Sequence, residues 1–154
     1  MKSRINWHEL VPDAYRAQAT LERYVRSSGL DPRLVELVKL RASQINQCAF
    51  CIDMHWKDLR AAGETEQRLY GLSAWRESPY YSDLERAALE WTESLTLLTD
   101  GFVPDDVYDR VHAHFGEEEL VKLTMAIVTI NGWNRLSVAF RTLAGQYQPG
   151  QYRT

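Results

Sequence analysis

The stretch that decides the fold is DPRLVELVKLRASQINQCAFCIDMH, residues 31–55. Asp31 followed by Pro32 is a strong helix start, because aspartate caps the first amides and proline suits the first helical position. The apolar residues that follow recur at helical spacing, and no part of the chain shows the sustained alternation of a half-buried strand. The stretch therefore predicts a helix from Pro32, a break over residues 44–47 and a second helix that begins near Cys48.

Helices are predicted along the rest of the chain as well. The second helix has Asn46 as its expected cap and Gly63 as its stop, and Ser82 with Glu85 forms the S-x-x-E pattern of a capping box. The further helices are expected over residues 12–29, 65–75, 82–99, 104–116 and 117–143. The fold class is therefore all-α. We expect one helical-bundle domain, 1–154, with about six to seven helices, a core over about 12–143 and a loose tail from about 146.

The composition excludes several classes of function. Of the 154 residues, 45% are hydrophobic and 25% are charged, and the net charge is −3. A chain with this balance and no lysine or arginine stripe is not expected to bind nucleic acid. No apolar run is long enough to cross a bilayer, and the first ten residues lack the apolar stretch of a signal peptide. The sequence therefore predicts a cytoplasmic protein without a membrane partner.

The two cysteines of the chain indicate its chemistry. Cys48 and Cys51 lie three residues apart, and His55 follows one helical turn after Cys51, so the three share a helix face. Cys48 falls at the predicted N-terminus of that helix, where the macrodipole favours a thiolate. A free cysteine with a pKa of about 8.5 is only ~3% thiolate at neutral pH, and a stabilisation of ~2 kcal/mol makes it roughly half thiolate. A helix terminus and a nearby imidazolium can supply that much.

Glu36 becomes relevant only if the chain reverses direction. On one continuous helix Glu36 and Cys48 would lie ~18 Å apart. A break over residues 44–47 lets Glu36 reach back to His55 and orient or protonate it. A continuous helix from Pro32 to Gly63 would refute this hypothesis.

Less reactive interpretations remain open for each of these residues. The two thiols can be buried structural side chains, or they can bind zinc with His55 and a fourth ligand from His112 or His114. No second CxxC or HxxxH supports a zinc site. For Glu36 by itself, a solvated helical carboxylate is the default interpretation.

The spacing Glu36-x11-Cys48-x2-Cys51-x3-His55 resembles the signature of the alkylhydroperoxidase D-like family, within the carboxymuconolactone decarboxylase-like superfamily. Similar stretches over residues 40–48, 58–65 and 130–135 extend the resemblance over most of the chain. One position departs from the family pattern: Phe50 stands where the best-studied branch carries a relay histidine. The decarboxylase branch lacks the cysteine pair, so the two thiols argue against lactone decarboxylation.

The resemblance implies peroxidase or disulfide-reductase chemistry, and the leading hypothesis is a thiol-dependent peroxidase. Cys51 is then the sulfur that attacks peroxide, Cys48 resolves it, and His55 and Glu36 form the proton relay, without a cofactor or metal. The implied partners are a peroxide or small disulfide substrate and an external dithiol reductant. The resemblance also implies a homo-oligomer, often a trimer or hexamer, which light scattering can test. The alternatives are a disulfide reductase without significant peroxidase activity, and a non-enzymatic metal-binding or interaction protein.

Overall fold

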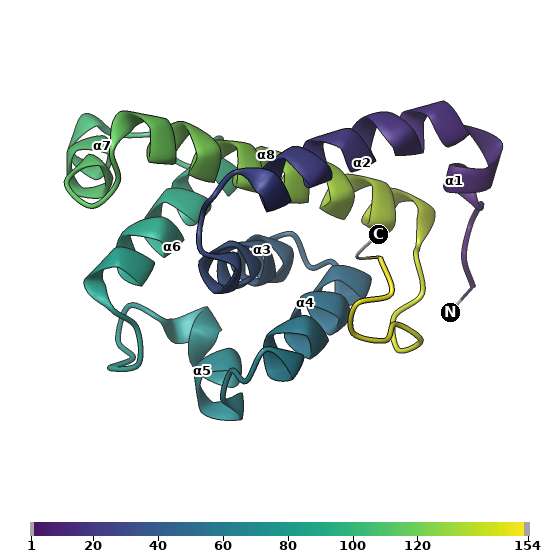
Figure 1. The fold of residues 1–154 in the computed structure, drawn as a ribbon, viewed down its shortest axis with the longest axis horizontal. Helices are drawn as coiled ribbons and strands as arrows, with labels where there is room; N and C mark the ends of the chain where they lie inside the picture. The colour runs from purple at the N-terminus through teal and green to yellow at the C-terminus, as the bar shows by residue number, and fades with distance from the viewer. Residues whose placement is uncertain (1, 153–154) are drawn as a thin grey trace.

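Helix α3, Pro32–Ile45, is the central element of the computed structural model, which describes residues 2–152 (Figure 1). The Asp31 carboxylate accepts a hydrogen bond of 2.9 Å from a main-chain amide of the first turn, as the sequence predicts. One face of α3 carries Leu34 and Val38 into a core shared with α6, α7 and α8. Another face packs against α4, α5 and α6 through apolar side chains that include Leu37 and Leu40.

The other helices surround α3. In chain order they are α1 (Trp7–Leu10), α2 (Pro12–Ser27), α4 (Ala49–Ala61), α5 (Glu66–Tyr70), the 3-10 helix η1 (Gly71–Ala74), α6 (Asp83–Thr96), α7 (Asp105–His112) and α8 (Glu117–Phe140). Between residues 2 and 152 there is no strand, so the predicted all-α class is confirmed. The eight α-helices in this described part of the chain exceed the predicted six to seven, mainly because the short α1 lies before the first expected helix. No helix in this part of the chain is long and apolar enough to cross a membrane.

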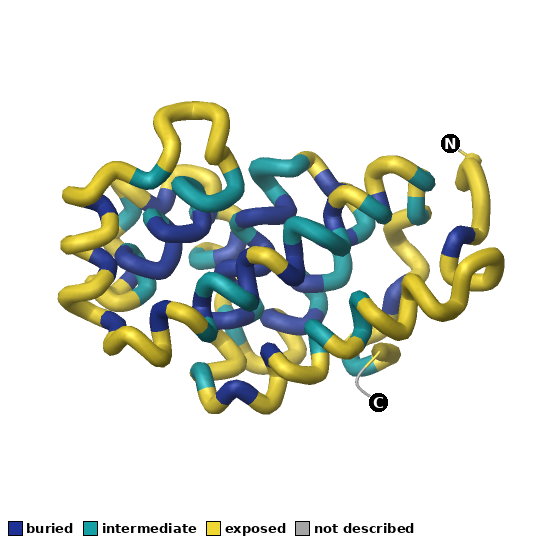
Figure 2. The backbone as a smooth tube through the Cα atoms, turned by 90° about the horizontal axis from the view of Figure 1, so that it is seen from above, coloured by how far each residue is buried: buried dark blue, intermediate teal, exposed yellow. Residues whose placement is uncertain are grey.

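The helices form two levels in the view of Figure 1. Helices α2 and α8 pack along each other above α3, while α4 and α5 lie below it. Helix α6 connects the two levels at the end of the molecule that carries α7. In the turned view of Figure 2 the buried residues gather in the interior of the molecule, and α3 contributes eight of them. The N-terminal segment lies beside α1, at the opposite end from α7, and the described C-terminal end lies by the last turn of α2, where Arg26 binds the Tyr152 main-chain oxygen (Figure 1).

The predicted break between α3 and α4 is present. Helix α3 ends at Ile45 and α4 begins at Ala49, and Gln47 between them has a φ of 54°, a left-handed conformation that ends a helix. The expected cap was wrong, because the α4 N-cap is Cys48 rather than Asn46. Asn46 ends α3, and its side-chain amide donates hydrogen bonds of 3.0 and 2.9 Å to two asparagines of α8.

The tail also differs from the sequence expectation. Residues 143–152 form no helix, but they fold back along α4 instead of lying loose. Tyr147 is buried, and the Lys57 side chain donates hydrogen bonds to the main-chain oxygens of Gly145 and Tyr147. The Asp53 carboxylate accepts from the Gly145 amide at 3.1 Å. These polar contacts join residues that are ~90 positions apart in sequence, so no local sequence pattern predicts them.

Packing in the core predicts a strong stability effect for Leu123 of α8. Its side chain is fully buried among apolar residues of α3, α6 and α7. Leu123→Ala is expected to lower the free energy of unfolding by about 2–5 kcal/mol, because it removes buried methyl groups and leaves a cavity. Urea unfolding measures this change. Val121→Ala on the exposed side of the same helix is the control and should change stability by less than about 0.5 kcal/mol. Equal effects of the two substitutions would contradict the packing.

Candidate active site

The two cysteines lie at the beginning of α4 and form a disulfide. Cys48 is the N-cap, and its sulfur lies 3.4 Å from the main-chain nitrogen of Cys51 in the first turn. Both side chains are only 1% exposed. The amides at a helix N-terminus point at this position, so a thiolate formed on reduction would receive hydrogen bonds and the positive end of the helix dipole.

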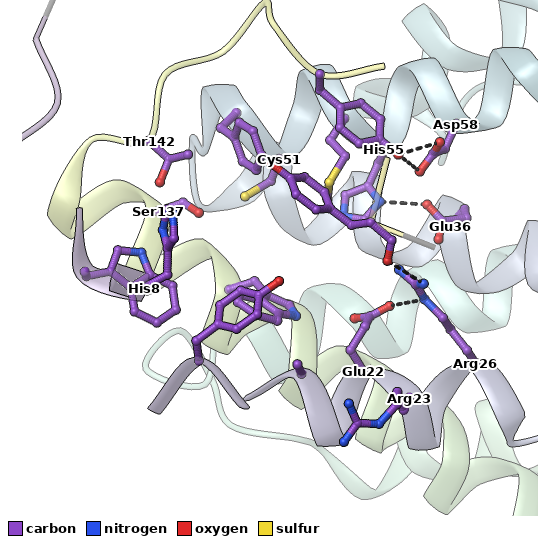
Figure 3. Close-up of a pocket in the computed structure, with 18 residues that line it drawn as sticks. His8, Glu22, Arg23, Arg26, Glu36, Cys51, His55, Asp58, Ser137 and Thr142 are labelled. Carbon is purple, nitrogen blue, oxygen red and sulfur yellow. Dashed lines mark hydrogen bonds and ion pairs between the residues drawn. The ribbon is translucent and has the colours of Figure 1, made fainter. Parts of the chain in front are cut away.

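His55 lies one turn further along α4 and is oriented by α3. Its Nδ1 is 2.7 Å from Oε2 of Glu36, so the reach predicted for Glu36 is confirmed (Figure 3). The imidazole is buried, and its Nε2 has no hydrogen-bond partner among the described residues. A carboxylate on Nδ1 fixes the ring with that nitrogen protonated and leaves Nε2 as the acceptor. The arrangement thus presents a base that can accept a proton inside the molecule.

A cavity of about 300 Å³ gives this group access to small molecules. Of the two sulfurs, the one that contributes to its wall is Cys51, and His55 and Glu36 line the same space (Figure 3). Aromatic side chains form a large part of the remaining wall, from Trp7, Tyr15, Phe50, Trp133, Tyr147 and Tyr152. The cavity therefore brings one cysteine and one imidazole together with an aromatic surface.

The tail closes one side of the cavity. The Tyr147 hydroxyl lies 2.9 Å from each carboxylate oxygen of Asp58, a buried residue one turn after His55. The amide of Gly150 donates to the same carboxylate at 3.3 Å, and the Arg26 guanidinium donates to the Tyr152 main-chain oxygen at 3.0 Å. The buried sulfur of Cys51 is consequently accessible to small reagents through the cavity, and to large ones only if the tail moves.

This covering predicts a size-dependent change in thiol reactivity. In the reduced protein, Tyr147→Ala removes a hydrogen bond to a buried carboxylate, which contributes roughly 1.5–3 kcal/mol. The tail is then expected to open at least about ten-fold more often. Labelling of Cys51 by a bulky dye-maleimide should become faster by about that factor, and labelling by iodoacetamide much less so. Tyr70→Ala, at an exposed tyrosine of α5, is the control. A ratio of the two labelling rates that stays at the wild-type value would show that the tail does not limit access.

A buried group of charges lies behind the imidazole. Lys39 of α3 is only 1% exposed, and its Nζ lies 2.5 Å from Oε1 of Glu22 on α2 and 3.8 Å from Oε1 of Glu36. Burial by itself raises the pKa of Glu22, but the charges of Lys39, Arg26 and His55 outweigh it and lower that pKa below its ordinary value. Glu22 is therefore a carboxylate at neutral pH, in spite of its partial burial.

Sequence reasoning identified four of these residues and missed others. Glu36, Cys51 and His55 meet at the cavity, and Cys48 lies behind Cys51 in the disulfide. Lys39, Glu22, Asp58 and Tyr147 were missed, although a lysine three residues after Glu36 in an apolar run was a usable signal for Lys39. His112 and His114 are exposed and lie outside the cavity wall, and the His112 ring contacts a main-chain oxygen of its own segment at 3.0 Å. Among residues 2–152 no three His, Cys, Asp or Glu side chains are gathered in a way that could hold a metal ion.

Comparison with known proteins gives relatives along most of the chain. The uncharacterized protein YdfG of Bacillus subtilis is 46% identical over 139 residues, which cover 90% of this chain and 95% of YdfG. The uncharacterized protein YnjA of Escherichia coli is 35% identical over 122 residues, 79% of this chain and 63% of YnjA.

Solved structures share the fold. A protein of unknown function from Agrobacterium tumefaciens, described as a candidate antioxidant defence protein AhpD, superposes with a TM-score of 0.92 at 48% identity, over 95% of this chain and 100% of that one. The debrominase Bmp8, crystallised as a cysteine-to-alanine variant in complex with 2,3,4-tribromopyrrole, has a TM-score of 0.79 at 15% identity, over 88% of this chain and 72% of that one, which shows the fold alone.

A family model agrees with these relatives and with the site geometry. The model of the carboxymuconolactone decarboxylase family matches residues 12–94, more than half of the chain, and this range includes both cysteines, His55 and Glu36. This chain therefore belongs to the carboxymuconolactone decarboxylase family, within the superfamily that also holds the AhpD-like proteins.

Proposed function

We propose that this chain is a thiol-dependent peroxidase in which Cys51 attacks a small hydroperoxide. One observation carries the proposal: Cys51 and the imidazole of His55 share the wall of one cavity, and Glu36 holds that imidazole at 2.7 Å. A buried sulfur, a base oriented by a carboxylate and a second cysteine are the groups that such a reaction needs.

The reaction begins from the reduced pair. His55 takes the proton of the Cys51 thiol at Nε2, and the thiolate attacks the outer oxygen of a hydroperoxide ROOH. The S–O bond forms as the O–O bond breaks, and the leaving alkoxide receives the proton from His55 and departs as the alcohol ROH. Cys51 is oxidised by two electrons to the sulfenic acid, and the peroxide is reduced by the same two electrons.

The second half restores the enzyme. The Cys48 thiol attacks the Cys51 sulfenic acid, which releases water and forms the disulfide that this structure holds. An external dithiol then exchanges with the disulfide, leaving both cysteines as thiols and the dithiol as its own disulfide. The nucleophilic sulfur for this exchange reaches the pair through the cavity beside Cys51.

The test measures two activities of the purified chain side by side with an excess of a small dithiol. One assay follows the loss of a hydroperoxide, and the other follows the reduction of a small disulfide in the absence of peroxide. The double variant Cys48→Ser/Cys51→Ser gives the background for both. Peroxide loss that depends on the two cysteines supports the proposal, and disulfide reduction without peroxide loss contradicts it.

Phe50 favours a disulfide reductase as the second candidate. Its ring lies in the cavity wall, next in sequence to Cys51, at the position where the resemblance implies a relay histidine. A phenyl ring cannot transfer protons, so His55 has to protonate a leaving alkoxide without a second relay group, whereas a thiolate leaving group at neutral pH needs much less assistance. The two assays described above separate the two candidates, because only the peroxidase consumes hydroperoxide.

A further inference from the structure

A buried ion pair behind the relay has no role in the steps described above. Lys39 and Glu22 join α3 to α2 at 2.5 Å, and both lie close to the carboxylate that orients His55. An ammonium that is 1% exposed is unfavourable unless carboxylates surround it, so the group is ionised as a unit. Such a cluster beside a base is expected to control how readily that base accepts a proton.

We propose that Glu22 and Lys39 are positioning residues that keep Glu36 ionised and available to His55, and so set the proton affinity of the imidazole. The inference deepens the proposed function and rests on it. The distances support this assignment, since Lys39 lies 2.5 Å from Glu22 and 3.8 Å from Glu36. Lys39 is thus bound mainly by Glu22, and the second oxygen of Glu36 remains bonded to His55.

Each member of the pair has a separate task. Without the ammonium, Glu22 and Glu36 would be two partly buried carboxylates at close range, and one of them would take up a proton. Without the Glu22 charge, Lys39 would turn its full charge towards Glu36 and oppose protonation of the nearby imidazole. The pair together leaves an anion facing His55, and this anion favours the imidazolium that forms when Cys51 gives up its proton.

The other charges on the cavity wall also favour the protonated form of His55. Besides tyrosines, the ionisable groups that share the cavity wall with His55 are Glu36 of α3, Asp58 of α4, His8 of α1, and Glu22, Arg23 and Arg26 of α2. The two arginines are exposed, so solvent screens them, whereas the Asp58 carboxylate is buried and the Glu22 and Glu36 carboxylates are partly buried. These three carboxylates outnumber the single buried ammonium, that of Lys39. The charge of His55 is also one of the causes that lower the pKa of Glu22, so a charged imidazole and the Glu22 carboxylate favour each other.

The experiment follows the ring resonances of His55 against pH in the oxidised protein, where no thiol titrates. The resonance is assigned by its absence from His55→Gln. In Glu22→Gln, which preserves shape and removes the charge, the midpoint of the ring titration is expected to fall by about 0.5–1 pH unit. In Arg26→Gln, which removes a cation from the same carboxylate, it is expected to rise by a smaller amount. Glu22→Asp retains the charge and should keep the midpoint near the wild-type value.

Glu93→Gln is the matched control for loss of an ion pair. Glu93 is 16% exposed against 15% for Glu22, and it pairs with a cation of α3 in the same way, Arg41, but lies outside the cavity wall. Glu93→Gln should leave the midpoint of the His55 titration unchanged. A midpoint in Glu22→Gln equal to that in Glu93→Gln would overturn the proposal and leave Glu22 a structural tie between α2 and α3. If Glu22→Gln fails to fold, the opposite shift expected in the exposed Arg26→Gln still decides. No peroxide enters the measurement, so it can fail or succeed independently of the peroxidase assay.

Discussion

Replacing Cys51 with serine is expected to reduce dithiol-dependent peroxide consumption by about three orders of magnitude or more, to the background of the buffer. A hydroxyl at this position is not ionised at neutral pH and is a much weaker nucleophile towards an O–O bond than a thiolate. Of the two cysteines only Cys51 lines the cavity, so Cys48 cannot take its place without movement of α4. The measurement is the initial rate of hydroperoxide loss at saturating dithiol.

Cys48→Ser is the matched variant, since it removes the other sulfur of the same pair. It retains the attacking thiol, so the reduced variant mixed with peroxide in the absence of dithiol should consume one equivalent rapidly and form no disulfide within the chain. Mass spectrometry should find Cys51 as sulfenic or further oxidised acid, because no resolving thiol is present. A Cys51→Ser variant that still turns over peroxide, or a Cys48→Ser variant that reacts with none, would reverse or remove the assigned roles.

Much of the site was predictable because its residues are close in sequence. Cys48, Cys51 and His55 lie within two turns of one helix, and helical spacing alone places them on one face. The contact between Glu36 and His55 needed one further inference, a break before Cys48, for which the segment 44–47 was the natural place. Caps such as Asp31 and Ser82 were predictable for the same reason, since their hydrogen bonds reach only two or three residues along the chain.

The contacts that escaped prediction join residues far apart in sequence. Glu22 and Lys39 belong to different helices, and only the packing of α2 beside α3 and α8 brings the two charges together. Tyr147 comes from a tail rich in polar residues and glycine, and this composition predicts a loop. It does not predict that the Tyr147 hydroxyl donates a hydrogen bond to the Asp58 carboxylate. Asn46 looked like a local cap, but its amide is bound by asparagines of α8 more than 80 residues later. Local patterns thus predict elements and their faces, and tertiary packing decides which polar side chains meet.

The second large effect is expected at His55. In His55→Gln the thiol of Cys51 has no internal base, and an ordinary cysteine is only ~3% thiolate at pH 7. The lower thiolate fraction accounts for about 30-fold. The leaving alkoxide also loses its proton donor, so the rate of peroxide consumption at that pH should fall by about 10²-fold in all, within the range typical for loss of a general acid or base. Glutamine preserves a polar group beside Glu36 and can keep a hydrogen bond to its carboxylate. The loss then reports the missing proton acceptor rather than a collapsed cavity.

The pH dependence distinguishes a base from a merely structural histidine. As the pH rises from 7 to about 9, the thiol ionises without assistance, so the rate of His55→Gln should climb towards that of the wild type and the ratio between them should shrink. A structural defect would reduce the rate by the same factor at every pH. His112→Gln, at an exposed histidine outside the cavity wall, should match the wild type throughout. Glu36 holds His55 at 2.7 Å, so Glu36→Gln should also slow peroxide consumption, and its rate should likewise approach that of the wild type as the pH rises. The loss of rate at neutral pH should be smaller than in His55→Gln, because the imidazole remains and only its orientation and its charge partner are weakened. A constant ratio for His55→Gln would mean that Cys51 ionises by the helix terminus alone, and the imidazole would then have no part in activating the sulfur.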